Sequence, residues 1–298
     1  MPISRFHVRW RQAIPLPQTA LLSVAILLSL PVSGRSQAFQ HQMDYRFSYA
    51  DVEDGILRRS HTWQWRYYRQ PLTRDGSPYG LENFYQRQRN WHLHWTGYDS
   101  RLTTGTGEGR QVGSGYEFRD LRTPITVAMA VRYRELNVHV LQPLSIASET
   151  YTARLGMYLQ ADHHIELSLT RRRDRTDSFY DNASTVRLLG MGFVNRSNGG
   201  KLVWHAGLGI EAYSDEYAVF RKTTGTNNER NVALDYYFPR QWHTGAYVDS
   251  FGDGLTGGLR IGLSVASYLE INLDLSHDDP KSDGLSADGM EIALRLQL

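Results

Sequence analysis

Histidines and acids of the types that bind metals or move protons gather at three places in the chain. They are His92 with His94, His163 and His164 beside Asp162, and His277 followed by Asp278 and Asp279. Such groups can hold Zn²⁺ or act as general bases in hydrolysis. Polar strand faces and solvated loops explain the same residues without chemistry, and the lack of cysteine excludes thiol catalysis. We therefore predict no enzyme, no metal site and no cofactor, and we keep an enzyme that acts on lipid or peptide as an alternative.

A period of two organises the segments that carry the charged residues. At the end of the chain, residues 290–298 alternate Met, Ile and Leu with Glu, Ala, Arg and Gln. This alternation predicts a β-strand with one apolar face and one wet face. About fourteen segments follow the pattern, at 41–50, 61–70, 90–97, 110–119, 124–133, 149–159, 165–170, 184–194, 202–210, 232–238, 242–248, 259–265, 268–276 and 290–298.

The N-terminus has the three parts of a secretory signal peptide. Arginines precede an apolar run at residues 19–32, and small residues then end at Ala38. The run is shorter than the roughly 20 residues of a spanning helix, which favours a cleaved signal over an anchor. We predict a signal peptide at 1–38 and a barrel domain at 39–298. Cleavage removes four arginines and no acids, so the formal net charge falls from +2 to −2, which gives no support to nucleic-acid binding.

The connections between the predicted strands alternate between long and short. Long polar stretches at 171–183, 214–230 and 277–289 are separated by tight turns, and only 71–87 breaks the order. Long loops on one side and short turns on the other are typical of outer-membrane barrels. A sheet that crosses lipid must also close on itself, because every backbone hydrogen bond has to be made within the protein. The predicted fold is all-β, a transmembrane antiparallel up-and-down β-barrel of about 14 strands, with 12–16 possible. A soluble secreted β-protein remains the alternative to this membrane barrel.

The irregular connection resembles a segment of a porin family of Gram-negative bacteria, over about 20 residues. The matching residues are Tyr67, Tyr68, Pro71, Asp75, Gly76, Pro78, Tyr79, Leu81, Phe84 and Arg87. The resemblance implies an outer-membrane porin. An even number of strands would place both termini in the periplasm, and a barrel of this strand number is wide enough to predict passive diffusion of small hydrophilic solutes. The chain departs from outer-membrane proteins at Leu298, where an aromatic residue is usual.

In such a barrel the wet face of each strand lines the lumen. The predicted lumen residues are Arg46, Arg66, His92, His94, Arg119, Arg132, Arg154, Glu166, Arg187, Glu211, Asp235, Asp249, Arg260, Glu270, Asp274, Glu291 and Arg295. Arginines facing carboxylates would give a narrow polar path with a transverse field. If these charges instead pair off, they plug the interior and leave a structural or surface-binding barrel.

The expected partners follow from the same reading. They are small hydrophilic solutes, outer-membrane lipid and lipopolysaccharide, and the barrel-assembly machinery, which would bind the C-terminal strand; no nucleic acid is expected. Arg171, Arg173 and Arg175 start a predicted extracellular loop and suit lipopolysaccharide phosphates. We also expect residues 290–298 to pair with 41–50 and close the sheet without an edge.

Overall fold

The fold is known from a computed structural model, and the residues from Ala38 onward form its β-sheet. The structure describes residues 38–52, 56–73, 86–102, 105–139, 144–160, 163–176, 180–186, 190–193, 202–217, 221–238, 242–252, 254–266, 268–280 and 286–298. The predicted signal peptide therefore lies outside the described residues, apart from Ala38. Within the described residues, no helix is both long and apolar enough to cross a membrane.

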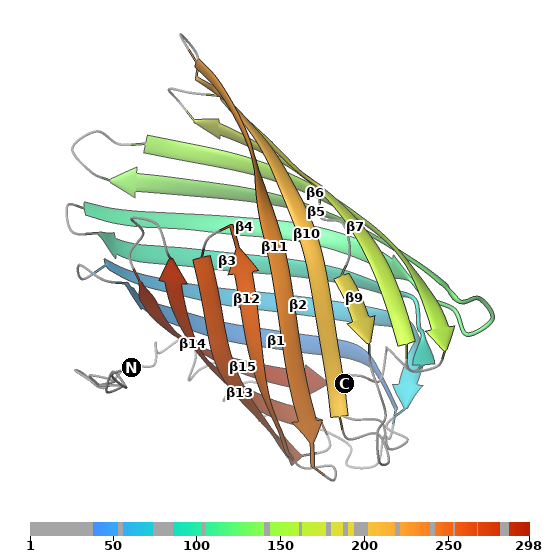
Figure 1. The fold of residues 1–298 in the computed structure, drawn as a ribbon. Coiled ribbons are helices and arrows are strands. Elements are labelled where there is room, and N and C mark those ends of the chain that lie inside the picture. Colours follow the sequence, from blue (N-terminus) through green and yellow to red (C-terminus); the bar gives the residue numbers. More distant parts are fainter. Residues whose placement is uncertain are drawn as a thin grey trace, which may run out of the picture. The chain divides into compact units, whose positions relative to one another are not determined.

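Fifteen strand segments form one sheet (Figure 1). They are β1 (Ala38–Val52), β2 (Ile56–Thr73), β3 (Asn90–Leu102), β4 (Gly105–Phe118), β5 (Ile125–His139), β6 (Leu144–Gln160), β7 (His163–Thr176), β8 (Tyr180–Val186), β9 (Gly190–Phe193), β10 (Leu202–Tyr217), β11 (Arg221–Tyr237), β12 (Trp242–Phe251), β13 (Gly254–Ala266), β14 (Leu269–Pro280) and β15 (Ala287–Gln297).

The sheet closes on itself as an up-and-down barrel. The strands pair antiparallel in chain order, except that β8 and β9 each pair with β7 and β10, and β15 pairs with β1. β8 and β9 both lie between β7 and β10, so they share one position and the barrel has 14 strands. The expected fold class is thus confirmed.

The seam between the ends of the chain is also confirmed. Met43 pairs with Leu296 and Tyr49 with Met290, in unbroken register. The backbone of Leu298 adds further bonds, since its N–H donates to the carbonyl of His41 (2.7 Å) and its carbonyl accepts from the N–H of His41 (2.8 Å). Every strand therefore has a partner on both sides, and no edge is left to recruit other chains.

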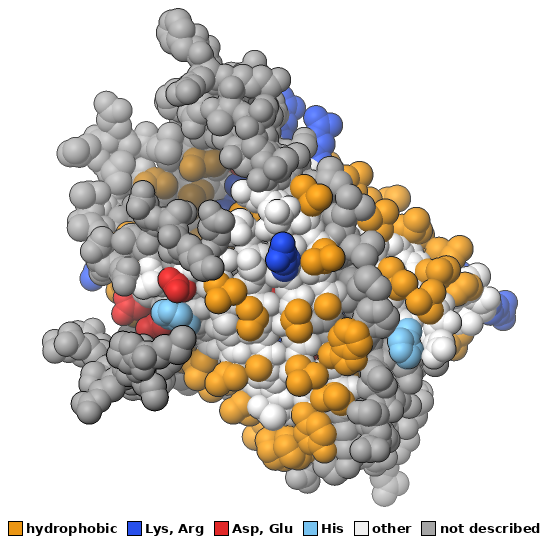
Figure 2. Space-filling model, viewed as in Figure 1, with side chains coloured by type: hydrophobic (Ala, Val, Ile, Leu, Met, Phe, Trp, Pro, Cys, Tyr) orange, Lys and Arg blue, Asp and Glu red, His pale blue; other side chains and the backbone are white. Residues whose placement is uncertain are grey.

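The outer face of the barrel is apolar. Apolar residues that pair across neighbouring strands lie side by side on it. Trp95 pairs with Val112 and Val112 with Tyr133, and all three side chains are more than a third exposed. Figure 2 shows the same kind of surface over the face that carries β10 to β13. Aromatic residues gather near strand ends, where Phe238 and Trp242 stack. An exposed apolar band with an aromatic girdle is the surface that a transmembrane barrel presents to lipid.

The strands are longer than the alternating segments predicted. The sequence suggests roughly 8–11 residues, whereas β2 has 18 and β11 has 17. The predicted loop at 214–230 is wrong, because β10 and β11 pair as far as Tyr217 and Arg221. The predicted loop start at Arg171 is also wrong, because β7 continues to Thr176. In both places the strands continue as a polar extension, where the two faces no longer differ in hydropathy.

Candidate functional site: the lumen

The barrel's inner face carries most of the predicted lumen residues. The register places on it Arg46, Arg66, His92, His94, Arg132, Arg154, Glu166, Asp235, Asp249, Arg260, Glu270, Asp274, Glu291 and Arg295. Arg119 follows β4 and hydrogen-bonds the inward Glu117. Arg187 lies outside the described residues, and Glu211 occupies β10 with a side chain that is not described.

One hydrogen-bonded network joins four strands at the end of the barrel where β1 begins and β15 ends, here called the terminus end. The Arg295 guanidinium donates to Asp44 (Nε to Oδ1, 2.8 Å) and to Glu270 (Nη1 to Oε2, 3.1 Å). Gln42 donates to the other oxygen of Asp44 (2.8 Å) and accepts from the Tyr68 hydroxyl (3.0 Å). Asp44 and Glu270 are almost fully buried, so their charges are held by these partners rather than by water.

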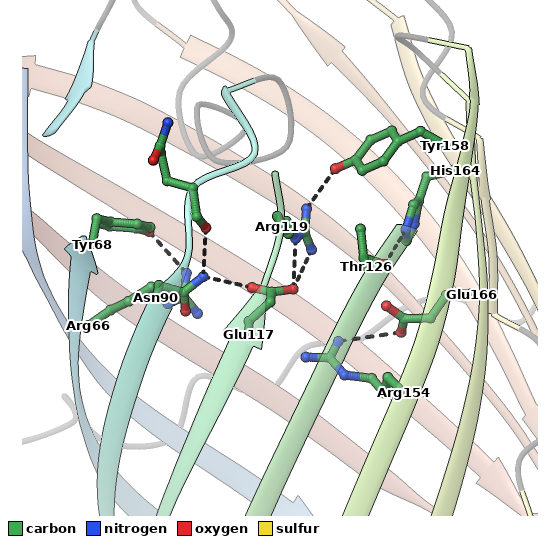
Figure 3. Close-up of polar contacts among 11 residues, drawn as sticks. Arg66, Tyr68, Asn90, Glu117, Arg119, Thr126, Arg154, Tyr158, His164 and Glu166 are labelled. Carbon is green, nitrogen blue, oxygen red and sulfur yellow. Dashed lines mark hydrogen bonds and ion pairs between the residues drawn. The ribbon is translucent and has the colours of Figure 1, made fainter. Parts of the chain in front are cut away.

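A second network continues around the same end (Figure 3). Glu117 accepts from the Asn90 amide (2.9 Å) and from the Arg119 guanidinium (Nε to Oε1, 2.8 Å). Arg119 also donates to the Tyr158 hydroxyl at 3.0 Å, which carries the network from β4 to β6. Both Glu117 and Asn90 are buried. Further along, Arg154 pairs with Glu166, and on the opposite arc the Arg260 guanidinium binds Asp235 through two nitrogens.

The segment before β3 reaches over this end of the lumen. Arg87 places its guanidinium 3.8 Å from the centre of the Tyr158 ring, although three strand pairings separate β3 from β6. The segment is tied down by Gln86, whose side chain accepts from the Thr73 N–H (2.7 Å) and donates to the Thr73 carbonyl. The irregular connection at 71–87 thus ends in a residue that contacts β6.

The other half of the lumen, toward the β1–β2 connection, is here called the loop end. It has exposed charges with few partners. Arg58, Arg132 and Arg134 face inward there, and no described carboxylate forms an ion pair with them. Arg134 lies over the Tyr98 ring at 5.0 Å. A cavity of about 350 Å³ in this half is bordered by Tyr98, Tyr247 and Glu291. Exposed unpaired charges indicate water, because a charge removed from water without a partner is costly.

Charges of opposite sign face each other across the lumen. On the wall formed by β2 to β7 and Arg119, the described inner face holds seven arginines and three carboxylates, an excess of four positive charges. On the wall formed by β11 to β15 and β1, it holds three arginines and eight carboxylates, an excess of five negative charges. A solute that crosses the barrel therefore passes through a transverse field.

Glycines in β4 make room for the two lumen histidines. His94 lies over Gly113 and His92 over Gly115, so close that a Cβ at either glycine would meet the imidazole at under 2.5 Å. Gln111 holds His94 at 3.2 Å between side-chain nitrogens. Because the rings lie along the wall, they take little of the bore. This arrangement explains the His pair as lumen packing.

The other histidines and acids singled out in the sequence lie in separate places where they are described, and Asp162 lies outside the described residues. His277 bonds Asp288 (2.8 Å) on the outer face, whereas Asp278 faces inward and accepts from Thr256 (2.9 Å). His164 contacts Thr126 (3.0 Å) inside the barrel, and His163 alternates to the other face of β7. Within the described residues no cluster of three His, Asp or Glu side chains has the spacing of a metal site.

The structure adds lumen residues that the sequence did not indicate. They are Arg58, Tyr98, Arg134, Arg172, Asp174, Glu229, Tyr247 and Asp278. Most lie beyond the apolar part of their strand, where the outer face is polar too. Extending the inward–outward alternation of side chains past the last apolar residue of each strand would have identified them. Arg172 and Asp174, for example, continue the inward face of Glu166 and hydrogen-bond each other at 2.9 Å.

Comparison with solved structures identifies the class of the fold as outer-membrane β-barrels. The structure aligns with Omp33 of Acinetobacter baumannii (13% identity, 89% of this chain and 100% of that one, TM-score 0.51). It aligns with a mutant of the monoaromatic hydrocarbon channel TodX (9%, 91% and 93%, TM-score 0.52) and with a bacterial polysaccharide outer membrane secretin (8%, 87% and 98%, TM-score 0.50). The porin resemblance is confirmed as a fold. No protein-family model and no curated protein matches the sequence.

Proposed function

We propose that the protein is an outer-membrane channel through which small hydrophilic solutes diffuse passively. The observation that carries the proposal is the pair of oppositely charged walls, on which Arg58 and Arg132 are exposed and have no acidic partner among the described residues. A plugged barrel would neutralise its inner charges with partners, as the terminus end does here. The fold supports the outer membrane as location. Termini in the periplasm agree with the short 119–124 turn at the terminus end.

Conductance in planar bilayers tests this proposal. We expect discrete conductance steps from the purified barrel, and a lower anion preference in the Arg132→Gln/Arg134→Gln variant. Two unit charges at close range in water interact by about 1 kcal/mol. Removing one lumen charge should therefore change the anion-to-cation permeability ratio roughly twofold to fivefold. Asp249→Asn/Asp274→Asn should shift it the opposite way. Arg171→Gln, on the outer face, is the control. A heat-modifiable barrel without conductance would leave the plugged alternative.

The outer face of β7 supports lipopolysaccharide as the surrounding lipid. Arg171, Arg173 and Arg175 alternate with the inward Arg172 and Asp174, so they project outward just beyond Leu169. An apolar groove of about 470 Å³ ends at Arg171. An acyl chain in the groove would bring its phosphate to the arginines. Replacing all three by Gln should reduce the lipopolysaccharide that copurifies, while replacing the inward Arg132 should not; equal retention would contradict the contact.

A further inference from the structure

A basic cavity lies at the rim of the terminus end, where it borders the second network and shares Arg119 with it. It has a volume of about 390 Å³ and lies between the end of β2, the segment before β3 and the turn after β4. Five arginines line it: Arg69, Arg87, Arg89, Arg119 and Arg122. Asp120 is the only carboxylate among its described lining residues.

The acids near the cavity are already engaged. Arg119 is paired with Glu117, and Arg89 with Asp120 at 3.2 Å. Asp120 also accepts from the backbone N–H of Arg122 (2.9 Å), and this bond together with Arg89 holds the pKa of that carboxyl below its usual value. Among the described residues, no carboxylate pairs with the guanidinium groups of Arg69, Arg87 or Arg122. The cavity therefore has three positive charges in excess.

Two of the five arginines are held in place by aromatic rings, while Arg69 and Arg122 are exposed at the mouth of the cavity. Arg87 has a left-handed backbone (φ 49°), stacks on Tyr158, and buries an Nε that has no hydrogen-bond partner. Arg89 lies 4.5 Å from the centre of the Phe118 ring. A left-handed backbone at a residue other than glycine is costly, and it persists only where the surroundings impose it. Cations that are already held in place need little ordering when they bind an anion.

We infer that this cavity binds a phosphate group at the terminus-end mouth. Guanidinium groups match the oxygens of phosphate in paired hydrogen bonds, and three surplus cations suit a doubly charged anion better than a single carboxylate. The cavity has the size of a small ligand site. The same chemistry fits the headgroup of a membrane phospholipid at the rim and a soluble phosphate ester near the pore mouth. Binding in either form is independent of whether the barrel conducts.

The test uses the full barrel in an uncharged detergent and compares two double variants. Arg69→Gln/Arg122→Gln removes two surplus cations, and Arg101→Gln/Arg230→Gln removes the same charge from β3 and β11, at residues that do not line the cavity. One arm titrates pyrophosphate against the thermal unfolding temperature, with chloride at equal ionic strength as reference. The other measures, by native mass spectrometry, how much phosphatidylglycerol stays bound relative to diacylglycerol, which lacks the phosphate.

A saturable rise in unfolding temperature with pyrophosphate, abolished in Arg69→Gln/Arg122→Gln and kept in the control, establishes a soluble phosphate ligand. Selective retention of phosphatidylglycerol with the same dependence establishes a lipid headgroup. Arg122→Gln alone, an exposed change in the turn, serves if the double variant does not fold, and it should weaken binding severalfold. If neither probe binds the wild type, or if both double variants lose binding equally, the inference is overturned.

Discussion

Replacing Gly113 by alanine should destabilise the barrel and narrow its bore. A Cβ at this position would lie 2.7 Å from the carbonyl oxygen of Val131 in β5 and 2.2 Å from Cε1 of His94. The imidazole can swing away, but only into the lumen. The backbone carbonyl would have to move by about 0.7 Å to reach the 3.4 Å of an ordinary contact. Overpacking of this kind costs about 1–3 kcal/mol, more than alanine gains in backbone entropy.

Gly257 provides a matched control in β13. The nearest atom to a Cβ there is the Tyr247 carbonyl oxygen at 3.9 Å, so Gly257→Ala should be neutral or slightly stabilising. Urea unfolding in micelles, followed by tryptophan fluorescence, measures both variants, and single-channel recording measures the bore. Adding His94→Ala to Gly113→Ala should restore conductance but only part of the stability, because the carbonyl contact remains. Equal stability of Gly113→Ala and Gly257→Ala would refute the packing argument.

Three further predictions test the network and the seam. Glu117→Gln leaves the Arg119 charge without its carboxylate and should lower the free energy of unfolding by about 1–3 kcal/mol, measured in urea. Arg46→Cys with Ala293→Cys, which pair directly, should form a disulfide that speeds migration on a non-reducing gel, whereas Arg46→Cys with Asn272→Cys, two strands apart, should not. Deleting Leu298 removes three backbone hydrogen bonds to β1 and should slow folding into vesicles; an unchanged rate would contradict a seam held there.

The apolar parts of the strands could be predicted because lipid enforces a strict alternation on them. Residues 290–298 show it in the sequence, and their partners in β1 follow from closure. The inward set follows from the same rule, since a one-residue slip would turn every apolar side chain into the lumen. The alternation also explains why residues as different as His94 and Arg132 share one face.

The polar extensions and the mouth could not be predicted in this way. Past Leu169 both faces of β7 are charged, so the period of two disappears from hydropathy although the strand continues to Thr176. The position of Arg87 depends on a contact with Tyr158, which is distant in sequence and recognisable only once the barrel has closed. The close approach at Gly113 depends on the backbone of the next strand and leaves no pattern beyond the glycine itself.

The distribution of ion pairs along the barrel indicates where the path is narrow. At the terminus end, Asp44, Glu117, Asp235 and Glu270 are each at most 8% exposed, and each is bonded to an arginine. At the loop end, the pairs Arg172–Asp174 and Arg46–Glu291 involve more exposed arginines, and Arg58 and Arg132 have no acidic partner among the described residues. Water can hold an isolated charge, whereas a buried one requires a partner, so the change from buried ion pairs to exposed charges indicates that water reaches the loop end more freely than the terminus end. If solutes cross the barrel as we propose, we expect the terminus end, where the two networks and Arg87 converge, to set their size limit.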